Sequence, residues 1–264
     1  MKKYVNYLYG LLAFFAAEGI QIIVAGVLAI VYSLVFGFSN GLEMNGLEIN
    51  SNALYLISIM ASLVCGAAFA LWYYGTSLAG VKEERKANFL HFLTGRNILL
   101  FLGLGLGCQF FTSGVMSLIQ SYFPKTFDNY SKVLELLTSG SIGLVVLYAV
   151  VIAPIVEELI FRGVILHLIG KANNVYLVII FQALLFGIYH GNIVQGIYGT
   201  GLGILLGYTM VKFRTIAAPI LLHMMINASA FLMNIIPSNM ISFLMMTLIG
   251  GTFIIWGIRN IKRV

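Results

Sequence analysis

Long apolar runs separated by short polar segments set the pattern of this chain. Eight runs approach or exceed the roughly 17–25 residues that a helix needs to cross the hydrocarbon core of a bilayer. They cover residues 8–36, 53–81, 98–120, 140–169, 175–190, 193–211, 216–236 and 240–258. The pattern predicts an all-α, polytopic membrane bundle with about eight transmembrane helices, in a single transmembrane domain over residues 1–264.

The composition agrees with a membrane protein. Hydrophobic residues make up 60% of the chain and charged residues 9%, against about 25% charged residues in soluble domains. The net charge of +6 does not indicate nucleic-acid binding, because the basic residues are scattered at the ends of the runs. Membrane lipids are the expected surroundings. Cys65 and Cys108 fall in apolar runs and are expected in the core.

The basic residues predict an orientation. Most lie on one side of an eight-span arrangement, and Lys125 and Lys132 lie on the other. The larger group comprises Lys2, Lys3, the basic residues of segment 82–96, Lys171, Lys212, Arg214, Arg259, Lys262 and Arg263. The positive-inside rule puts this side, and both termini, in the cytoplasm. We expect a multi-pass protein of the cell membrane.

Two adjacent carboxylates, Glu157 and Glu158, interrupt the fourth run. A charged group at the bilayer centre costs roughly 2.5 kcal/mol or more, so such residues need partners, water or a function. Glu158 and Arg162 are four residues apart and can pair on one helical face. Glu157 points about 100° away and has no local partner. Glu157 is therefore the candidate for a chemically available carboxylate.

Three further polar residues fall at membrane depth on other runs. His190 follows Phe186 by four residues, and His223 and Asn227 are also four apart and share a helical face. Hydrogen bonding between helices is an open alternative for each of them. Their occurrence together with Glu157, on three separate runs, favours a functional site.

Two other features have less specific interpretations. Glu18 and Gln21 in the first run are expected to line a cavity or to meet Arg162, and no chemistry is assigned to them. The sixth run is rich in glycine between residues 196 and 207. This spacing favours close helix packing, with room for a substrate segment as the alternative.

The polar residues form three motifs: Glu-Glu-x-x-x-Arg (Glu157, Glu158, Arg162), Phe-x-x-x-His (Phe186, His190) and His-x-x-x-Asn (His223, Asn227). Their order along the fourth, fifth and seventh apolar runs resembles that in the CPBP intramembrane proteases, also called the CAAX protease or Abi family. That family includes Ras-converting CAAX endopeptidases and bacteriocin-immunity proteins. The resemblance covers residues 140–238, the expected catalytic core.

Peptide hydrolysis needs an activated water and stabilisation of the tetrahedral oxyanion. Glu157 is suited to act as general base together with His190. His223 and Asn227 are suited to donate hydrogen bonds to the oxyanion. Glu158, Arg162 and Phe186 are expected to support these groups.

A metal-dependent mechanism is the alternative. Glu157, His190 and His223 provide two histidines and one glutamate, a known catalytic zinc set. The chain lacks a His-Glu-x-x-His sequence, and Asn227 is a more natural oxyanion donor than metal ligand. The cofactor is left open between none and Zn²⁺, with the metal-free mechanism preferred.

The span alternation creates one geometric difficulty. It places His190 near the outer side of the membrane, whereas Glu157 and His223 lie toward the cytoplasmic side. Either the turn at residues 191–192 is recessed into the bundle, which requires cover by protein or water, or the boundary near residues 173–174 is elsewhere.

The leading prediction is an intramembrane endopeptidase that acts on membrane-associated peptides or protein tails. A non-catalytic bacteriocin-immunity or membrane binding protein is the alternative. A transporter is disfavoured because no inverted repeat is evident. The basic start, the small size and the lack of added domains resemble bacterial proteins, for which a prenylated CAAX substrate is not expected.

Overall fold

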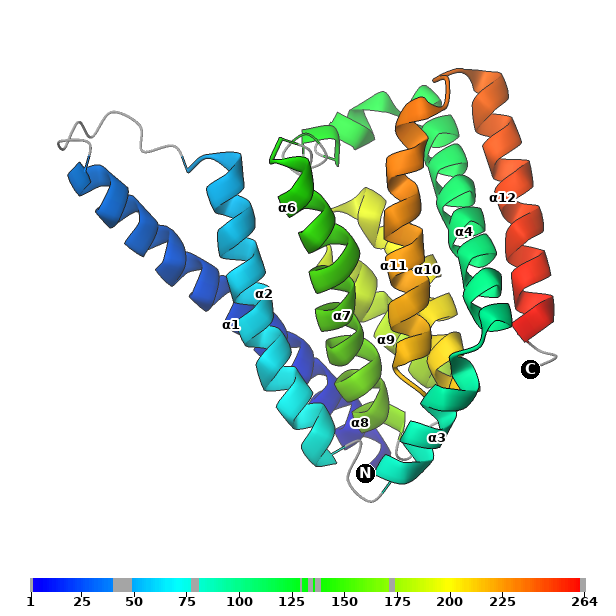
Figure 1. The fold of residues 1–264 in the computed structure, drawn as a ribbon, viewed down its shortest axis with the longest axis horizontal. Helices are drawn as coiled ribbons and strands as arrows, with labels where there is room; N and C mark the ends of the chain where they lie inside the picture. The colour runs from blue at the N-terminus through cyan, green and yellow to red at the C-terminus, as the bar shows by residue number, and fades with distance from the viewer. Residues whose placement is uncertain are drawn as a thin grey trace.

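The computed structural model describes residues 2–39, 49–76, 81–128, 130–132, 135, 139–170 and 174–261. Every regular element within these residues is a helix, which confirms the all-α prediction (Figure 1). Lys171, Lys262 and Arg263, which contribute to the predicted orientation, lie outside the described residues.

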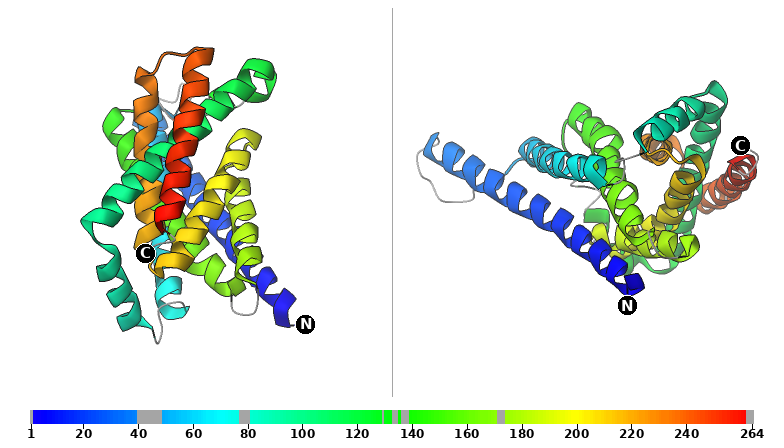
Figure 2. Two further views of the ribbon diagram at one scale, coloured as in Figure 1. Left: turned by 90° about the vertical axis from the view of Figure 1, so that its right-hand side faces the viewer. Right: turned by 90° about the horizontal axis from the view of Figure 1, so that it is seen from below.

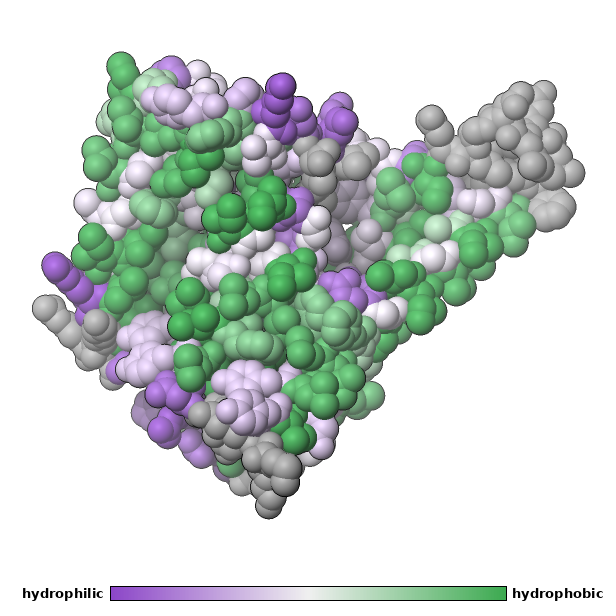
Figure 3. Space-filling view, turned by 180° about the vertical axis from the view of Figure 1, so that it is seen from behind, coloured by the Kyte–Doolittle hydropathy of each residue, from purple (hydrophilic) through white to green (hydrophobic). Residues whose placement is uncertain are grey.

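All eight predicted runs coincide with helical rods. These are α1 (Lys2–Ser39), α2 (Ser51–Thr76), α4 (Gly95–Tyr122), the rod Ile142–Gly170, α9 (Val175–Tyr189), α10 (Ile193–Phe213), α11 (Ala217–Ala230) and α12 (Met240–Ile261). In the described part of the chain, five helices are long and apolar enough to cross a membrane: Tyr4–Val35, Ser51–Thr76, Gly95–Tyr122, Ile142–Gly170 and Met240–Ile261. Shorter apolar helices complete the bundle, and apolar side chains cover most of the face in Figure 3.

The segment between the second and third runs, whose structure the hydrophobic pattern does not predict, folds as α3 (Lys82–Phe92). The N-terminus, α3 and the end of α8 lie at one end of the bundle in Figure 1. The short helix η1 (Pro124–Phe127), which contains Lys125, follows α4 at the opposite end. The described segments of the larger basic group therefore gather at one end, as the predicted orientation requires, and Lys125 lies at the other.

The fourth rod is not a uniform α-helix. It runs through α6 (Ile142–Val146), the π-helical η2 (Leu147–Ile152), α7 (Ala153–Glu158), the π-helical η3 (Leu159–Ile165) and α8 (Leu166–Gly170). Pro154 has no N–H, and its ring crowds the carbonyl four residues earlier, so the wider turn of η2 accommodates it. The two π segments bracket α7, which carries both glutamates, and such segments are frequent at functional sites.

Helix α9 is too short to cross a bilayer along a straight path. Its 15 residues rise about 22 Å, against a hydrocarbon core of about 30 Å. The chain reverses at Gly191, whose φ of 68° is left-handed, and the Asn192 side chain caps α10 by accepting from the Gln195 N–H. Figures 1 and 2 show this turn short of the end of the bundle at which α11 connects to α12. The recessed turn is therefore the arrangement that the structure has.

Helix α1 crosses the others obliquely and splays away from them toward its C-terminal end (Figures 1 and 2). Its first half packs against the fourth rod. For example, a Cβ added to Gly10 would lie 2.7 Å from Ile169. Cys65 and Cys108 are buried in the core, 0% and 1% exposed, as predicted.

Candidate active site

The predicted ion pair between Glu158 and Arg162 is present and completely buried. Arg162 Nη1 lies 2.9 Å from Glu158 Oε1, and both side chains are 0% exposed. Arg162 Nη2 donates to the Gly203 carbonyl over 3.0 Å, and the guanidinium carbon lies 4.6 Å from the centroid of the Phe186 ring. A buried ion pair needs such additional partners, because removing two charges from water is costly. Gln182 also donates to the Gly203 carbonyl, over 2.9 Å, and the sequence did not indicate this contact.

Glycines of α10 bring it close enough to α9 for these contacts. A Cβ on Gly203 would lie 3.0 Å from the Cα of Ala183 on α9. On the other side of the interface, a Cβ on Gly187 would lie 2.2 Å from Thr200 Oγ1. The glycine-rich run thus serves helix packing, which was the preferred interpretation.

His223 lies between the two glutamates. Its Nδ1 is 2.9 Å from Glu158 Oε1, and its Nε2 is 3.8 Å from Glu157 Oε2. An ionised carboxylate can only accept, so we assign the proton on Nδ1 to the bond with Glu158. The side chain of His223 is 8% exposed and that of Glu157 is 16% exposed. The neighbour of Glu157 is thus His223 of α11, one of the residues that the sequence analysis assigns to the same site.

His190 occupies the C-cap of α9, and its role there explains the four-residue spacing from Phe186. Its Nδ1 lies 2.8 Å from the Phe186 carbonyl, one of the last-turn carbonyls that a helix end leaves without a partner. A carbonyl can only accept, so Nδ1 carries the proton and Nε2 is left for other chemistry. The Phe186 ring centroid is 4.9 Å from that of His190 and 5.7 Å from that of His223. The recessed turn thus places both histidines against one phenylalanine.

Asn227 reaches from α11 to the π-helical part of the fourth rod. Its Nδ2 donates to the carbonyl of Ala149 over 2.8 Å. One amide N–H is therefore committed, and the second N–H remains for a ligand.

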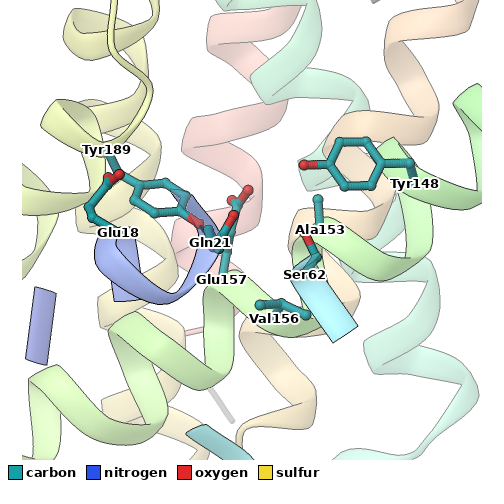
Figure 4. A pocket seen from close by; sticks show the side chains of 8 residues that line it. All are labelled: Glu18, Gln21, Ser62, Tyr148, Ala153, Val156, Glu157 and Tyr189. Atoms are coloured by element: carbon teal, nitrogen blue, oxygen red, sulfur yellow. Dashed lines mark hydrogen bonds between the residues drawn. The ribbon is translucent and has the colours of Figure 1, made fainter. Parts of the chain in front are cut away.

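A polar cavity of about 210 Å³ opens beside Glu157. It is lined by Glu18, Gln21, Ser62, Tyr148, Ala153, Val156, Glu157 and Tyr189. In Figure 4 the Glu157 carboxylate points between Gln21 and Tyr189 on one side and Tyr148 on the other.

The first helix lines one side of this cavity. Glu18 and Gln21 line it, and Gln21 donates to the Tyr189 hydroxyl. Arg162 instead bonds Glu158 and Gly203, so of the two expectations for Glu18 and Gln21 the cavity is the one realised. Ser62, Tyr148 and Tyr189 were missed, because a lone serine or tyrosine in an apolar run carries no signal that separates a cavity wall from a core position.

The alternative zinc set does not form a ligand group in this arrangement. Within the described residues, no three side chains of His, Cys, Asp or Glu are placed to hold a metal ion together. His223 Nδ1 is bonded to Glu158, and His190 Nδ1 is bonded to a backbone carbonyl. One nitrogen of each imidazole is therefore committed to a hydrogen bond.

The fold and the site define a class: a polytopic α-helical membrane protein with a buried glutamate–histidine site beside a polar cavity. Residues 139–229 match the family described as type II CAAX prenyl endopeptidase Rce1-like. This segment contains all seven residues of the three motifs, so the resemblance drawn from the motifs is confirmed.

A relative of similar length gives the same indication. The chain is 23% identical over 237 residues to a Bacillus subtilis (strain 168) protein named "Putative membrane peptidase YdiL". The alignment covers 87% of this chain and 93% of that protein. No solved structure gives a significant match. Together the family match and this relative support a membrane protease.

Proposed function

We propose that the protein is an intramembrane endopeptidase that hydrolyses peptide bonds in membrane-associated peptides or protein tails. The observation that carries the proposal is the position of Glu157. Its carboxylate lines a polar cavity among apolar helices and lies 3.8 Å from His223 Nε2. A buried ion pair fixes the other nitrogen of the same imidazole.

Glu157 acts as the general base. It takes a proton from a water molecule in the cavity, and the resulting hydroxide attacks the carbonyl carbon of the scissile bond. His190 shares this water with Glu157 and contacts it through Nε2, because its Nδ1–H donates to the Phe186 carbonyl. When the tetrahedral intermediate collapses, the C–N bond breaks and the leaving amine takes the proton that Glu157 removed from water, either directly or through Nε2 of His190.

His223 and Asn227 stabilise the oxyanion of that intermediate. Because Nδ1–H of His223 donates to Glu158, its Nε2 can donate only when the ring is an imidazolium cation. Asn227 contributes the N–H that is not bonded to Ala149. Removing one donor of this kind typically lowers kcat by about 10²–10³-fold.

Replacing Glu157 by glutamine tests the proposal. Glu157→Gln keeps the shape of the side chain and removes the base, so cleavage should fall by about 10²–10⁴-fold. Peptides released from the membrane fraction of cells expressing each form, compared by mass spectrometry, give a readout that does not depend on choosing a substrate. Thermal unfolding should be unchanged.

Glu83→Gln is the matched control. Glu83 is exposed on α3, so this variant should release the same peptides as the wild type. Cleavage retained by a folded Glu157→Gln protein would rule out Glu157 as the base. A cellular phenotype that persists without cleavage would indicate a binding or immunity function instead.

A further inference from the structure

A second depression lies at the end of the bundle that carries α3. It has a volume of about 570 Å³ and lies between α3, the start of α11 and α7. Its lining comprises Lys82, Arg85, Lys86, Phe89, Phe92, Leu93, Ile155, Thr215, Ile216, Ala217, Ile220, Leu221 and Met224. The volume falls within the range of small-molecule sites.

The first turns of α3 place three basic side chains at one end of this groove. Lys82, Arg85 and Lys86 recur at the spacing of one helical face and line the groove. Glu83 and Glu84 do not line it, and Glu84 lies 3.6 Å from Arg214. Arg85 Nη1 donates to the Arg214 carbonyl, and Lys82 Nζ lies 5.9 Å from the centroid of the Tyr74 ring. The lining residues therefore include three cations, whose charged heads lie at the rim of the groove, and no carboxylate.

The rest of the groove is apolar. The same face of α3 continues with aromatic residues such as Phe89, and α11 contributes aliphatic side chains such as Ile220 and Met224. The groove also reaches Ile155, two residues before Glu157. A ligand that satisfies both parts must combine an anionic group with a hydrocarbon chain.

We propose that this groove binds an anionic phospholipid of the surrounding bilayer. The phosphate would lie against Lys82, Arg85 and Lys86, and an acyl chain would lie along the wall that α3 and α11 form. A free anion would not contact the apolar wall. A zwitterionic lipid would be attracted less strongly than an anionic lipid to the three cations. The groove lies at an end of the membrane-crossing helices, where headgroups meet the protein, and basic pockets between such helices bind acidic headgroups.

Native mass spectrometry of the full-length protein tests this. The protein is incubated with either phosphatidylglycerol or phosphatidylcholine, both of the same acyl composition. The wild type should retain phosphatidylglycerol preferentially. The double variant Lys82→Gln/Lys86→Gln should bind it on the order of tenfold more weakly, because each basic residue contributes to attraction of an anionic headgroup.

Two further variants make the test specific. Lys125→Gln/Lys132→Gln removes the same charge outside the groove and should bind as the wild type does. Ala217→Trp fills the apolar part without a change of charge and should weaken retention while thermal unfolding stays cooperative. Glu157→Gln should bind the lipid normally, so the result is separate from the proposed protease activity.

Three results would overturn the lipid site. They are an unchanged phosphatidylglycerol preference in Lys82→Gln/Lys86→Gln, an equal loss in Lys125→Gln/Lys132→Gln, and displacement of the lipid by inorganic phosphate alone. The second would indicate attraction by net charge only. The third would indicate a site for the anion only.

Discussion

Arg162 connects the three motifs at the level of single residues. It pairs with Glu158 of its own helix, and its guanidinium lies over the ring of Phe186, which belongs to the second motif. Glu158 in turn accepts from His223 of the third motif. The pair thus orients the imidazole that faces Glu157, and the orientation depends on a charge that is fully buried.

Arg162→Ala should lower the free energy of unfolding by about 3–5 kcal/mol, because it leaves Glu158 as an uncompensated buried charge. Equilibrium unfolding in detergent measures the change. Arg259→Ala, at an exposed position of α12, is the control and should stay within about 0.5 kcal/mol of the wild type. The joint variant Glu158→Leu/Arg162→Met should recover part of the loss. If it were as unstable as Arg162→Ala, burial of an unpaired charge would not be the cause.

Sequence spacing predicts those contacts of the site that lie within one helix. Glu158 and Arg162 pair as predicted, because residues four apart are neighbours on a helix. The bond from His190 to the Phe186 carbonyl spans the same interval, although only the spacing was noted in the sequence. Contacts between helices carry no such signal. The bond from His223 to Glu158 spans 65 positions of the chain, and the tyrosines of the cavity look like ordinary core residues in the sequence.

At the level of elements, the site depends on irregular helices. Pro154 sits where the π-helical η2 gives way to α7, and Asn227 bonds a carbonyl within η2. Helix α9 ends early, and its C-cap is His190. The hydropathy pattern located these helices correctly along the chain. It contains no information on π turns or on the depth at which a helix ends. For this reason the sequence analysis placed His190 at a different membrane depth from Glu157 and His223.

The close packing of α9 against α10 positions that helix end. In Gly187→Ala the new methyl would lie 2.2 Å from Thr200 Oγ1 and 2.5 Å from the Gly196 carbonyl, so the helices must separate. We expect a loss of about 1–3 kcal/mol in the free energy of unfolding. Cleavage should also fall, because His190 follows three residues later.

Gly201→Ala provides the comparison on the neighbouring helix. Nothing lies within 4 Å of a Cβ at Gly201, so this change should be neutral or stabilise the helix by up to about 1 kcal/mol. Unfolding and peptide release should be measured for both variants. Equal effects at the two positions would show that helix contact at Gly187 is not what matters.

At the level of the whole molecule, the apolar runs were sufficient to predict the bundle, because each run became a helical rod. The polar segment that became α3 was not predictable from hydropathy, which measures only the tendency to leave water. Its placement against α11 creates the groove with three cations at one end. The same charges support the orientation, since the basic segments that are described gather at one end of the molecule.

Cysteine labelling tests this orientation. Cys65 and Cys108 are 0% and 1% exposed, so they should not react with a membrane-impermeant maleimide, and cysteines introduced at exposed positions should report their own side. The positive-inside rule puts the α3 end in the cytoplasm. Lys125→Cys should therefore be labelled in intact cells, and Glu83→Cys only after the membrane is permeabilised.

The opposite labelling pattern would mean that the protein has the inverted orientation. The groove beside α3 would then lie in the other leaflet, where the negative surface potential of the cytoplasmic face does not act. The labelling result thus decides the side of the membrane on which an anionic lipid must be sought.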